Sequence, residues 1–328
     1  MSKLQRSCTV LTWALFAALL TAPLRAEAQE ARKLHRIGIL DFFPLPNARD
    51  EAFRKALRDL GYVEGRNVVI ISRSADRVRD RLPQLAADIV AAKVDVIVVA
   101  TGTSALVVKD VTSTIPVVMM GSADAVTMGI VGSLARPGGN VTGLTIISTE
   151  VAAKRLELLA ALPAVKKIAV LWCPVAPIQH DELRHTAEAA KRLGVDIEPI
   201  EYRQGSTTWQ SVTASLVKAR PQGLFLLDCT YLPFQQLVDF AIQQRMPTMT
   251  PYLSVAQQGA LLAYGPDGVP MARRAASYVD KIIKGSNPAD LPVEQPTQFE
   301  LVINLKTARA IGLALPQSIL VRASRVIE

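Results

Sequence analysis

The chain contains one pattern of structural elements twice. Residues 36–71 read as an apolar strand, an amphipathic helix ending at Leu60-Gly61, and a second strand. Residues 167–200 repeat that order, with the helix ending at Leu193-Gly194. Glycine accepts the left-handed backbone that ends a helix, so both boundaries have a physical cause. Two similar openings predict two similar lobes, because a single core rarely extends over about 300 residues.

Short apolar runs alternate with amphipathic stretches along most of the chain, which predicts parallel sheets covered by helices on both faces. The expected strands are 37–40, 68–71, 94–99, 116–119, 141–145, 168–172, 195–200 and 224–227. The expected helices are 50–60, 81–92, 150–161, 181–193, 207–219, 234–244 and 270–284. The predicted fold class is therefore α/β, with two Rossmann-like lobes.

The first 28 residues are typical of a cleavable export signal. Lys3 and Arg6 form a basic start, an apolar run follows at 10–20, and Ala26-Glu27-Ala28 offers a small-residue cleavage site. The apolar run is shorter than the roughly 20 residues of a membrane span. We therefore expect a periplasmic protein, with an uncleaved N-terminal anchor as the alternative.

Several function classes lack a signal in this sequence. The 37 basic and 29 acidic residues are scattered without long runs, so a nucleic-acid surface is not expected. We find no phosphate-binding loop, no dinucleotide fingerprint, no nucleophile elbow and no His-Glu-x-x-His. The sequence therefore predicts neither an enzyme nor a bound cofactor or metal.

A set of motifs spread over the mature chain points to a known family. They are 61–67 (GYVEGRN), 100–105 (ATGTSA), 113–118 (STIPVV), 134–143 (LARPGGNVTG), 154–159 (KRLELL), 291–297 (LPVEQPT) and 299–308 (FELVINLKTA). Together they resemble the extracytoplasmic substrate-binding proteins of uncharacterised ABC transporters, which are similar to tryptophan- and phenylalanine-binding receptors. The resemblance implies the type I periplasmic-binding-protein fold, in which three chain segments join two lobes around a ligand.

The resemblance also implies partners and boundaries. It predicts a monomer that binds a small carboxylate, such as an amino acid or aromatic acid, and delivers it to an ABC permease. A sensor for a membrane receptor or kinase is one alternative, and an exported enzyme using Asp124 and Asp228 is another. The first lobe is expected at 33–146 plus about 262–290, and the second at 147–261 plus about 291–328. Crossings are expected at 145–149, at 248–252 or 261–265, and near 290–298.

Ligands bind beyond the carboxyl ends of strands in open α/β sheets, which selects the candidate site residues. These are Asp41, Phe42, Thr101, Thr103, Ser104, Ala105, Ser122, Asp124, Asp228, Tyr231, Tyr252 and Tyr264. The turn at 101–105 opens a helix, whose amides suit a carboxylate. The alternative is an ordinary helix cap bonded to its own first turn.

The other candidates also have a functional and a structural interpretation. Asp124 can pair with a ligand ammonium or cap the segment at 125–134, and Asp41 and Asp228 can serve the pocket or a turn. Phe42, Tyr231 and Tyr252 can stack on a planar ligand or simply pack. Trp172 at a strand end is expected in the core.

Cys173 and Cys229 follow strands that are neighbours in the fold that the resemblance implies. An exported protein can meet an oxidising compartment. The two residues are therefore predicted either to form a disulfide near the pocket or to remain as two thiols.

Overall fold

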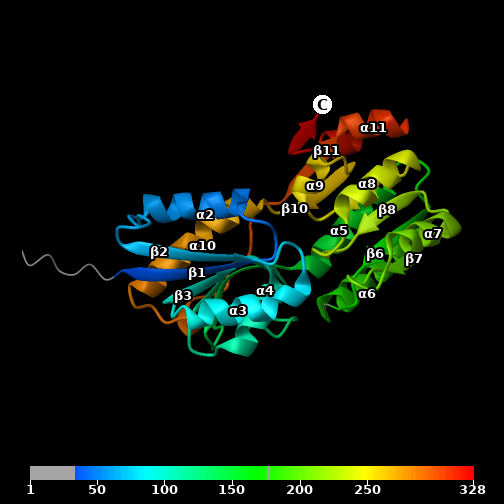
Figure 1. Cartoon of the computed structure of the whole chain (residues 1–328). Coiled ribbons are helices and arrows are strands. Elements are labelled where there is room, and N and C mark those ends of the chain that lie inside the picture. Colours follow the sequence, from blue (N-terminus) through cyan, green and yellow to red (C-terminus); the bar gives the residue numbers. More distant parts are fainter. Residues whose placement is uncertain (1–33, 176) are drawn as a thin grey trace, which may run out of the picture. The chain divides into compact units, whose positions relative to one another are not determined.

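The computed structural model describes residues 34–175 and 177–328, so the export signal predicted at 1–28 lies outside the described residues. The strands form two sheets, one of five strands in the order β2-β1-β3-β4-β5 and one of seven in the order β12-β11-β10-β9-β8-β6-β7. Figure 1 shows helices packed against both sheets. The predicted α/β class is confirmed.

The five-stranded sheet and its helices form the first lobe. Its strands are β1 (His35–Asp41), β2 (Val68–Ser74), β3 (Val96–Val99), β4 (Val117–Ala123) and β5 (Val141–Ile146). Its helices are α2 (Ala48–Asp59), α3 (Leu82–Ala91), α4 (Gly102–Val111) and, from much later in the chain, α10 (Gly268–Ile283), with the short turn η1 (Arg79–Arg81) before α3. All neighbouring strands of this sheet run parallel.

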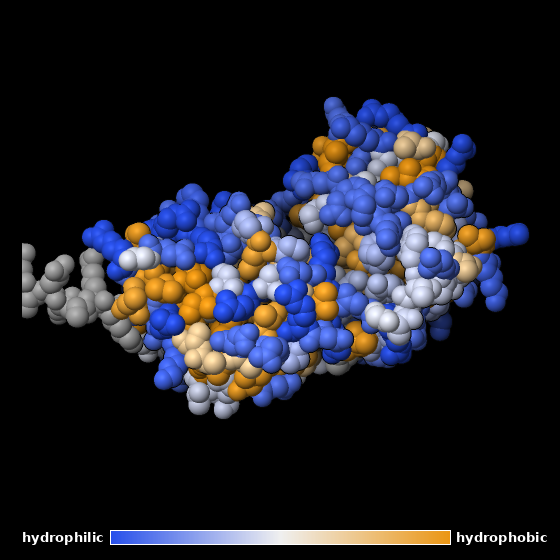
Figure 2. Space-filling view, viewed as in Figure 1, coloured by the Kyte–Doolittle hydropathy of each residue, from blue (hydrophilic) through white to orange (hydrophobic). Residues whose placement is uncertain are grey.

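Alternation along β1 explains how helices cover both faces of the first sheet. Ile37 and Ile39 pack in one cluster with residues of α2 and α10, whereas Leu40 packs in another with residues of α3. Successive side chains of a strand point to opposite faces, so one strand supplies both cores. The outward face of α2 is covered by hydrophilic side chains (Figure 2), as its amphipathic sequence predicts.

The seven-stranded sheet organises the second lobe. Its strands are β6 (Lys167–Trp172), β7 (Asp196–Glu201), β8 (Gly223–Leu226), β9 (Thr248–Thr250), β10 (Leu262–Gly265), β11 (Glu300–Asn304) and β12 (Arg325–Ile327). Its helices are α5 (Ser148–Ala160), α6 (Pro177–Leu193), α7 (Trp209–Ala219), α8 (Phe234–Gln243), α9 (Leu253–Gln257), α11 (Leu305–Ile311) and α12 (Gln317–Leu320). Only the β10–β11 pair is antiparallel among the strand pairs of the described residues.

One strand is less buried than its sequence indicates. The apolar run at 195–200 predicts a strand covered on both faces, but within β7 only Ile200 is buried. The reason is position, because β7 ends the sheet and pairs with β6 alone.

The chain passes between the lobes at three places. The first follows β5 and leads into α5, close to the expected 145–149. The second joins β10 to α10, so the candidate at 248–252 is wrong, because β9 pairs with β8 and β10 inside the second sheet. The third runs from the turn η2 (Pro288–Asp290) to β11.

The lobe boundary near residue 262 differs from expectation. We expected 262–290 in the first lobe. Within this range β10 belongs to the second sheet instead, whereas α10 packs on α2 and β4 of the first lobe. The third passage lies beside β5, where the amide of Thr145 donates to the carbonyl of Glu294 at 2.9 Å and the amide of Glu294 donates to the carbonyl of Gly143 at 2.9 Å. No helix within the described ranges is long and apolar enough to cross a membrane.

The pairing of β4 with β5, at the edge of the first sheet, contains a shift in register next to the site. The pairing slips between Met119 and Ser122. Opposite this irregularity, Gly143 has φ +120°, and a Cβ atom there would collide with the backbone oxygen and nitrogen of Met119. Only glycine fits both the conformation and the space.

Candidate functional site

A cavity of about 490 Å³ lies beyond the carboxyl ends of strands from both sheets. The first lobe contributes the segments that follow β1, β3 and β4, and the second lobe contributes those that follow β8 and β9. This size falls within the range of pockets for small molecules, about 300–1,000 Å³. Six of the predicted site residues line it: Thr101, Thr103, Ser122, Asp228, Tyr231 and Tyr252.

The first turn of α4 presents free amides to the cavity. Thr101 is the N-cap, and its Oγ accepts a hydrogen bond of 3.2 Å from the amide of Ser104. Gly102 and Thr103 line the cavity, and their amides are among those that lack a partner inside a helix. The cap and the cavity lining therefore coexist in one turn, and Thr101 belongs to both.

Two members of the predicted turn are structural. Ser104 is fully buried and bonds to the Thr101 hydroxyl at 2.9 Å, and Ala105 packs in the core. Neither lines the cavity. The helical repeat explains this, since residues three and four positions past the cap turn toward the sheet that α4 covers.

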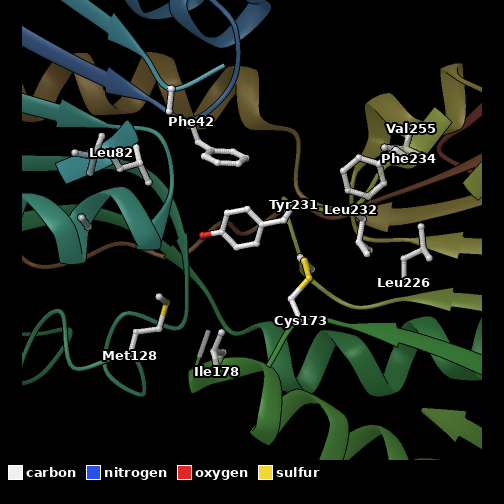
Figure 3. Packing of buried hydrophobic residues seen from close by; sticks show 14 of the residues in the cluster. Phe42, Leu82, Met128, Cys173, Ile178, Leu226, Tyr231, Leu232, Phe234 and Val255 are labelled. Atoms are coloured by element: carbon white, nitrogen blue, oxygen red, sulfur yellow. A yellow bond between two sulfur atoms is a disulfide. The ribbon is translucent and has the colours of Figure 1, made fainter. Parts of the chain in front are cut away.

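Asp41 and Phe42 lie behind the cavity wall. Asp41 is 1% exposed and accepts hydrogen bonds of 2.9 Å from the amide of Phe43 and from the side chain of Asn47. Phe42 is buried edge-on against Tyr231, with ring centroids 5.0 Å apart (Figure 3). Neither residue lines the cavity, but the adjacent Phe43 does. In this loop it is therefore Phe43, one residue beyond the predicted pair, that reaches the cavity.

Asp124 also does not line the cavity. Its carboxylate accepts hydrogen bonds of 3.1 Å from the amides of Val126 and Thr127. It therefore closes a turn rather than capping a helix, because the segment at 125–134 is not helical. An acid–base pair of Asp124 and Asp228 is not assembled in the cavity, which removes the observation behind the enzyme alternative.

The second lobe places an acidic and an aromatic side chain in contact. The hydroxyl of Tyr252 donates to a carboxylate oxygen of Asp228 at 2.5 Å, and both residues line the cavity. Burial, with the nearby charge of Asp228, raises the pKa of Tyr252 far above its usual value. Tyr252 therefore remains a donor. Tyr264 does not line the cavity and stacks on Phe299 instead.

Three arginines that sequence reasoning missed line the cavity: Arg49, Arg77 and Arg155. Arg49 and Arg77 both lie over the ring of Phe43, with 5.0 and 4.8 Å from guanidinium carbon to ring centroid. The Arg49 guanidinium also donates to the carbonyl of Ala100 at 3.3 Å, next to the α4 cap. These contacts place two guanidinium groups on the first-lobe wall, and that of Arg49 also lies 3.5 Å from the buried carboxylate of Asp41.

Arg155 is the most buried of these three arginines. It is 2% exposed, and its Nε donates to the carbonyl of Tyr264 at 2.6 Å. Burial lowers the pKa of its guanidinium, and the charges of Asp228 and Glu182 oppose that shift. The sequence holds a signal, since Arg155 shares the apolar stripe of α5 with Ala152 and Leu159, where a charge is exceptional.

A buried carboxyl supports the loop that carries Asp228. Glu182 on α6 is fully buried, and its Oε2 accepts hydrogen bonds from the side chain of Gln179 at 2.6 Å and from the amide of Asp228 at 3.2 Å. Burial, followed by the charge of Asp228, raises the pKa of Glu182 to about 8. The carboxyl is therefore mostly protonated at neutral pH, which limits the charge beside Asp228.

Cys173 and Cys229 form a disulfide whose Cα atoms are 5.9 Å apart, so the structure selects the bridge over two thiols. They follow the neighbouring strands β6 and β8, and both line the cavity. Figure 3 shows the bond between the two sulfur atoms at Cys173. The bridge and Glu182 together hold the loop of Asp228 and Tyr231. Trp172, next to Cys173, is 7% exposed within the second-lobe core, as expected.

Comparisons with known proteins give a consistent answer. Residues 44–327 match the family described as ABC transporter substrate binding protein. The chain is similar to a tyrosine-binding protein of Clostridioides difficile, with 27% identity over 299 residues that cover 87% of this chain and 83% of the relative.

Solved structures agree on the fold. An ABC domain from Streptococcus pneumonia in complex with L-Trp has a TM-score of 0.81 at 22% identity and covers 90% of this chain and 100% of its own. A conserved domain protein from Vibrio cholerae has a TM-score of 0.83 at 25% identity with the same coverage. The predicted type I periplasmic-binding-protein fold is thus confirmed. Since the family match spans most of the described residues, this chain belongs to the ABC transporter substrate binding protein family.

Proposed function

We propose that the protein is an extracytoplasmic receptor that binds an amino acid with an aromatic or large apolar side chain and delivers it to an ABC permease. One observation carries the proposal: a single cavity brings together the open first turn of α4, the carboxylate of Asp228 and aromatic side chains. These groups match the carboxylate, the ammonium and the side chain of such a ligand. The tyrosine-binding relative supports the same class.

The ligand carboxylate binds at the first turn of α4. The free amides of Gly102 and Thr103 point along the helix axis, where the helix dipole favours negative charge. Arg77 on the same wall adds positive charge, whereas the charge of Arg49 is shared with the carboxylate of Asp41. A carboxylate placed here accepts charge-assisted hydrogen bonds, each contributing about 1.5–3 kcal/mol.

The ligand ammonium binds Asp228. One oxygen of this carboxylate accepts from Tyr252, which leaves the other for the ligand. The Asp228 loop is held by the disulfide and by Glu182, so the acid is preorganised. Preorganisation reduces the entropy that binding costs.

Closure on the ligand prepares the receptor for its permease. The carboxylate site lies on the first lobe and Asp228 on the second, so the ligand bridges the two. A ligand with contacts to both lobes shifts the balance between open and closed forms toward the closed one. The closed form, acting as a monomer, then presents both lobes to the membrane complex.

Calorimetric titration with tyrosine, tryptophan, phenylalanine, leucine and benzoate tests the proposal. At about 100 times its dissociation constant, a true ligand adds roughly 2.7 kcal/mol of stability, which a thermal shift also detects. We expect Asp228→Asn and Thr103→Trp to abolish binding, whereas the matched control Asp124→Asn retains it. Binding that is lost in the control and kept in Asp228→Asn overturns the proposal, as does the absence of binding by every amino acid.

A further inference from the structure

Arg155 is a buried cation whose pairing is incomplete. Its side chain is 2% exposed, and among the described residues only its Nε has a hydrogen-bond partner, the carbonyl of Tyr264. The buried Nη1 atom has no partner in residues 34–175 and 177–328. A buried donor left unpaired costs about 1–3 kcal/mol, and more when it is charged, so such groups are rare in folded proteins.

The acids near Arg155 do not complete its pairing. The charge of Asp228 acts on the guanidinium, but neither Asp228 nor Glu182 forms an ion pair with it within the described part of the chain. Asp228 instead accepts from Tyr252, and Glu182 accepts from Gln179 and from the Asp228 amide. The guanidinium therefore keeps donor capacity.

Arg155 lines the same cavity from the second lobe. It belongs to α5 and bonds to β10 of the second lobe, whereas Gly102 and Thr103 belong to the first. The cavity thus has two donor sites on different sheets, with Asp228 as the acceptor for a cation. A ligand that spans the cavity meets a donor at each end.

We propose that Arg155 binds a second oxygen acceptor of the ligand, at the end remote from its α-carboxylate. The ligand class is then an amino acid whose side chain ends in a hydroxyl or carboxylate oxygen. This inference rests on the proposed function and sharpens it, since an apolar side chain leaves the guanidinium unpaired. A site built to bond an oxygen disfavours the analogue that lacks it, because the buried donor then has no partner.

L-Tyrosine and L-phenylalanine differ by one oxygen and serve as the first probe pair. L-Tyrosinamide removes the carboxylate charge instead, and 4-carboxy-L-phenylalanine places a carboxylate where tyrosine has its hydroxyl. We expect the wild-type protein to bind tyrosine or the carboxy analogue at least about tenfold more tightly than phenylalanine, as one charge-assisted hydrogen bond implies. Whichever of these two ligands binds more tightly shows whether the acceptor is a hydroxyl or a carboxylate oxygen.

The variant Arg155→Met then tests whether the guanidinium of Arg155 is responsible for this preference. We expect this variant to bring the affinity ratio of the preferred ligand to phenylalanine close to one, with the ratio of tyrosine to tyrosinamide unchanged. Lys154→Met is the matched control, because the adjacent Lys154 pairs with Glu157 and does not line the cavity. Arg155→Lys keeps the charge but loses the planar donor, and it reports on binding if the methionine variant folds poorly.

Three results overturn the inference. One is equal affinity of the wild type for tyrosine, 4-carboxy-L-phenylalanine and phenylalanine, which leaves the proposed function intact. Another is a change in the tyrosine-to-tyrosinamide ratio in Arg155→Met, which places the α-carboxylate on Arg155. The last is an equal loss for every ligand, which makes Arg155 purely structural. If no amino acid binds the wild type at all, the proposed function itself fails.

Discussion

The hydroxyl of Tyr231 donates a hydrogen bond of 3.0 Å to the hydroxyl of Thr103. The bond joins the loop after β8 to the first turn of α4, and therefore the two lobes at the cavity. Removing either partner is expected to cost about 1 kcal/mol. Tyr231→Phe and Thr103→Val are each expected to lower the unfolding free energy by this amount, and the double variant by no more than one of them. Strictly additive losses in denaturant unfolding contradict the contact.

The pKa of Glu182 predicts a pH dependence of stability. Its carboxyl has a pKa of about 8 in the folded protein and an ordinary value of 4.5. The folded protein therefore holds a proton that the unfolded chain releases, so the contribution of Glu182 to stability is greatest at low pH and falls as the pH rises from 4.5 to 8. The slope reaches about 1.4 kcal/mol per pH unit.

Glu182→Gln provides the comparison, because its amide oxygen keeps the bonds from Gln179 and Asp228 and does not titrate. Urea unfolding at pH 5, 6.5 and 8 should show a steeper decline in the wild type than in the variant. Parallel profiles argue against a buried protonated carboxyl.

The disulfide should contribute both stability and affinity. It closes a segment with a sequence separation of 56 residues, and such bridges typically add about 2–4 kcal/mol. The double variant Cys173→Ser/Cys229→Ser is expected to unfold at correspondingly lower denaturant. Its ligand affinity should also fall, because the loop of Asp228 and Tyr231 loses a constraint. Mass spectrometry of unreduced peptides that finds two thiols in the native protein contradicts both expectations.

Gly143→Ala is expected to be one of the most damaging single methyl additions. The residue has φ +120°, and the new Cβ would meet the backbone of Met119, which cannot move aside as a side chain can. A loss of about 3 kcal/mol or more follows from strain and steric overlap. The matched control is Gly139→Ala, where a Cβ has open space. Similar melting temperatures for the two variants would refute this account of the β4–β5 irregularity.

Periodicity was sufficient to predict the elements of this fold. Apolar runs marked β1 and β6 because parallel strands bury both faces, and amphipathic stripes marked α2 and α10. The rule for strand ends was sufficient to find Thr103 and Asp228. It was insufficient to separate Phe42 from Phe43, because alternating side chains make one neighbour core and the other wall.

The remainder of the site depends on contacts that local sequence does not contain. Asp124 and Thr101 carry the same capping signal. Only tertiary packing decides that the turn beginning at Thr101 lines the cavity and that Asp124 does not. Arg155 reaches the cavity from the interior of a helix rather than from a strand end. A charge on an apolar stripe was its one local signal.

Helix α10 completes the first lobe although the whole stretch from α5 to β10 separates it from β5. During synthesis the ribosome therefore releases β1 to β5 long before the helix that covers one face of their sheet. The sheet of the second lobe is complete only after β11 and β12 have been synthesised, which is later still. Premature termination before β11 thus leaves the second core without Leu301 and Ile303, and termination before α10 also removes the helix that completes one face of the first sheet.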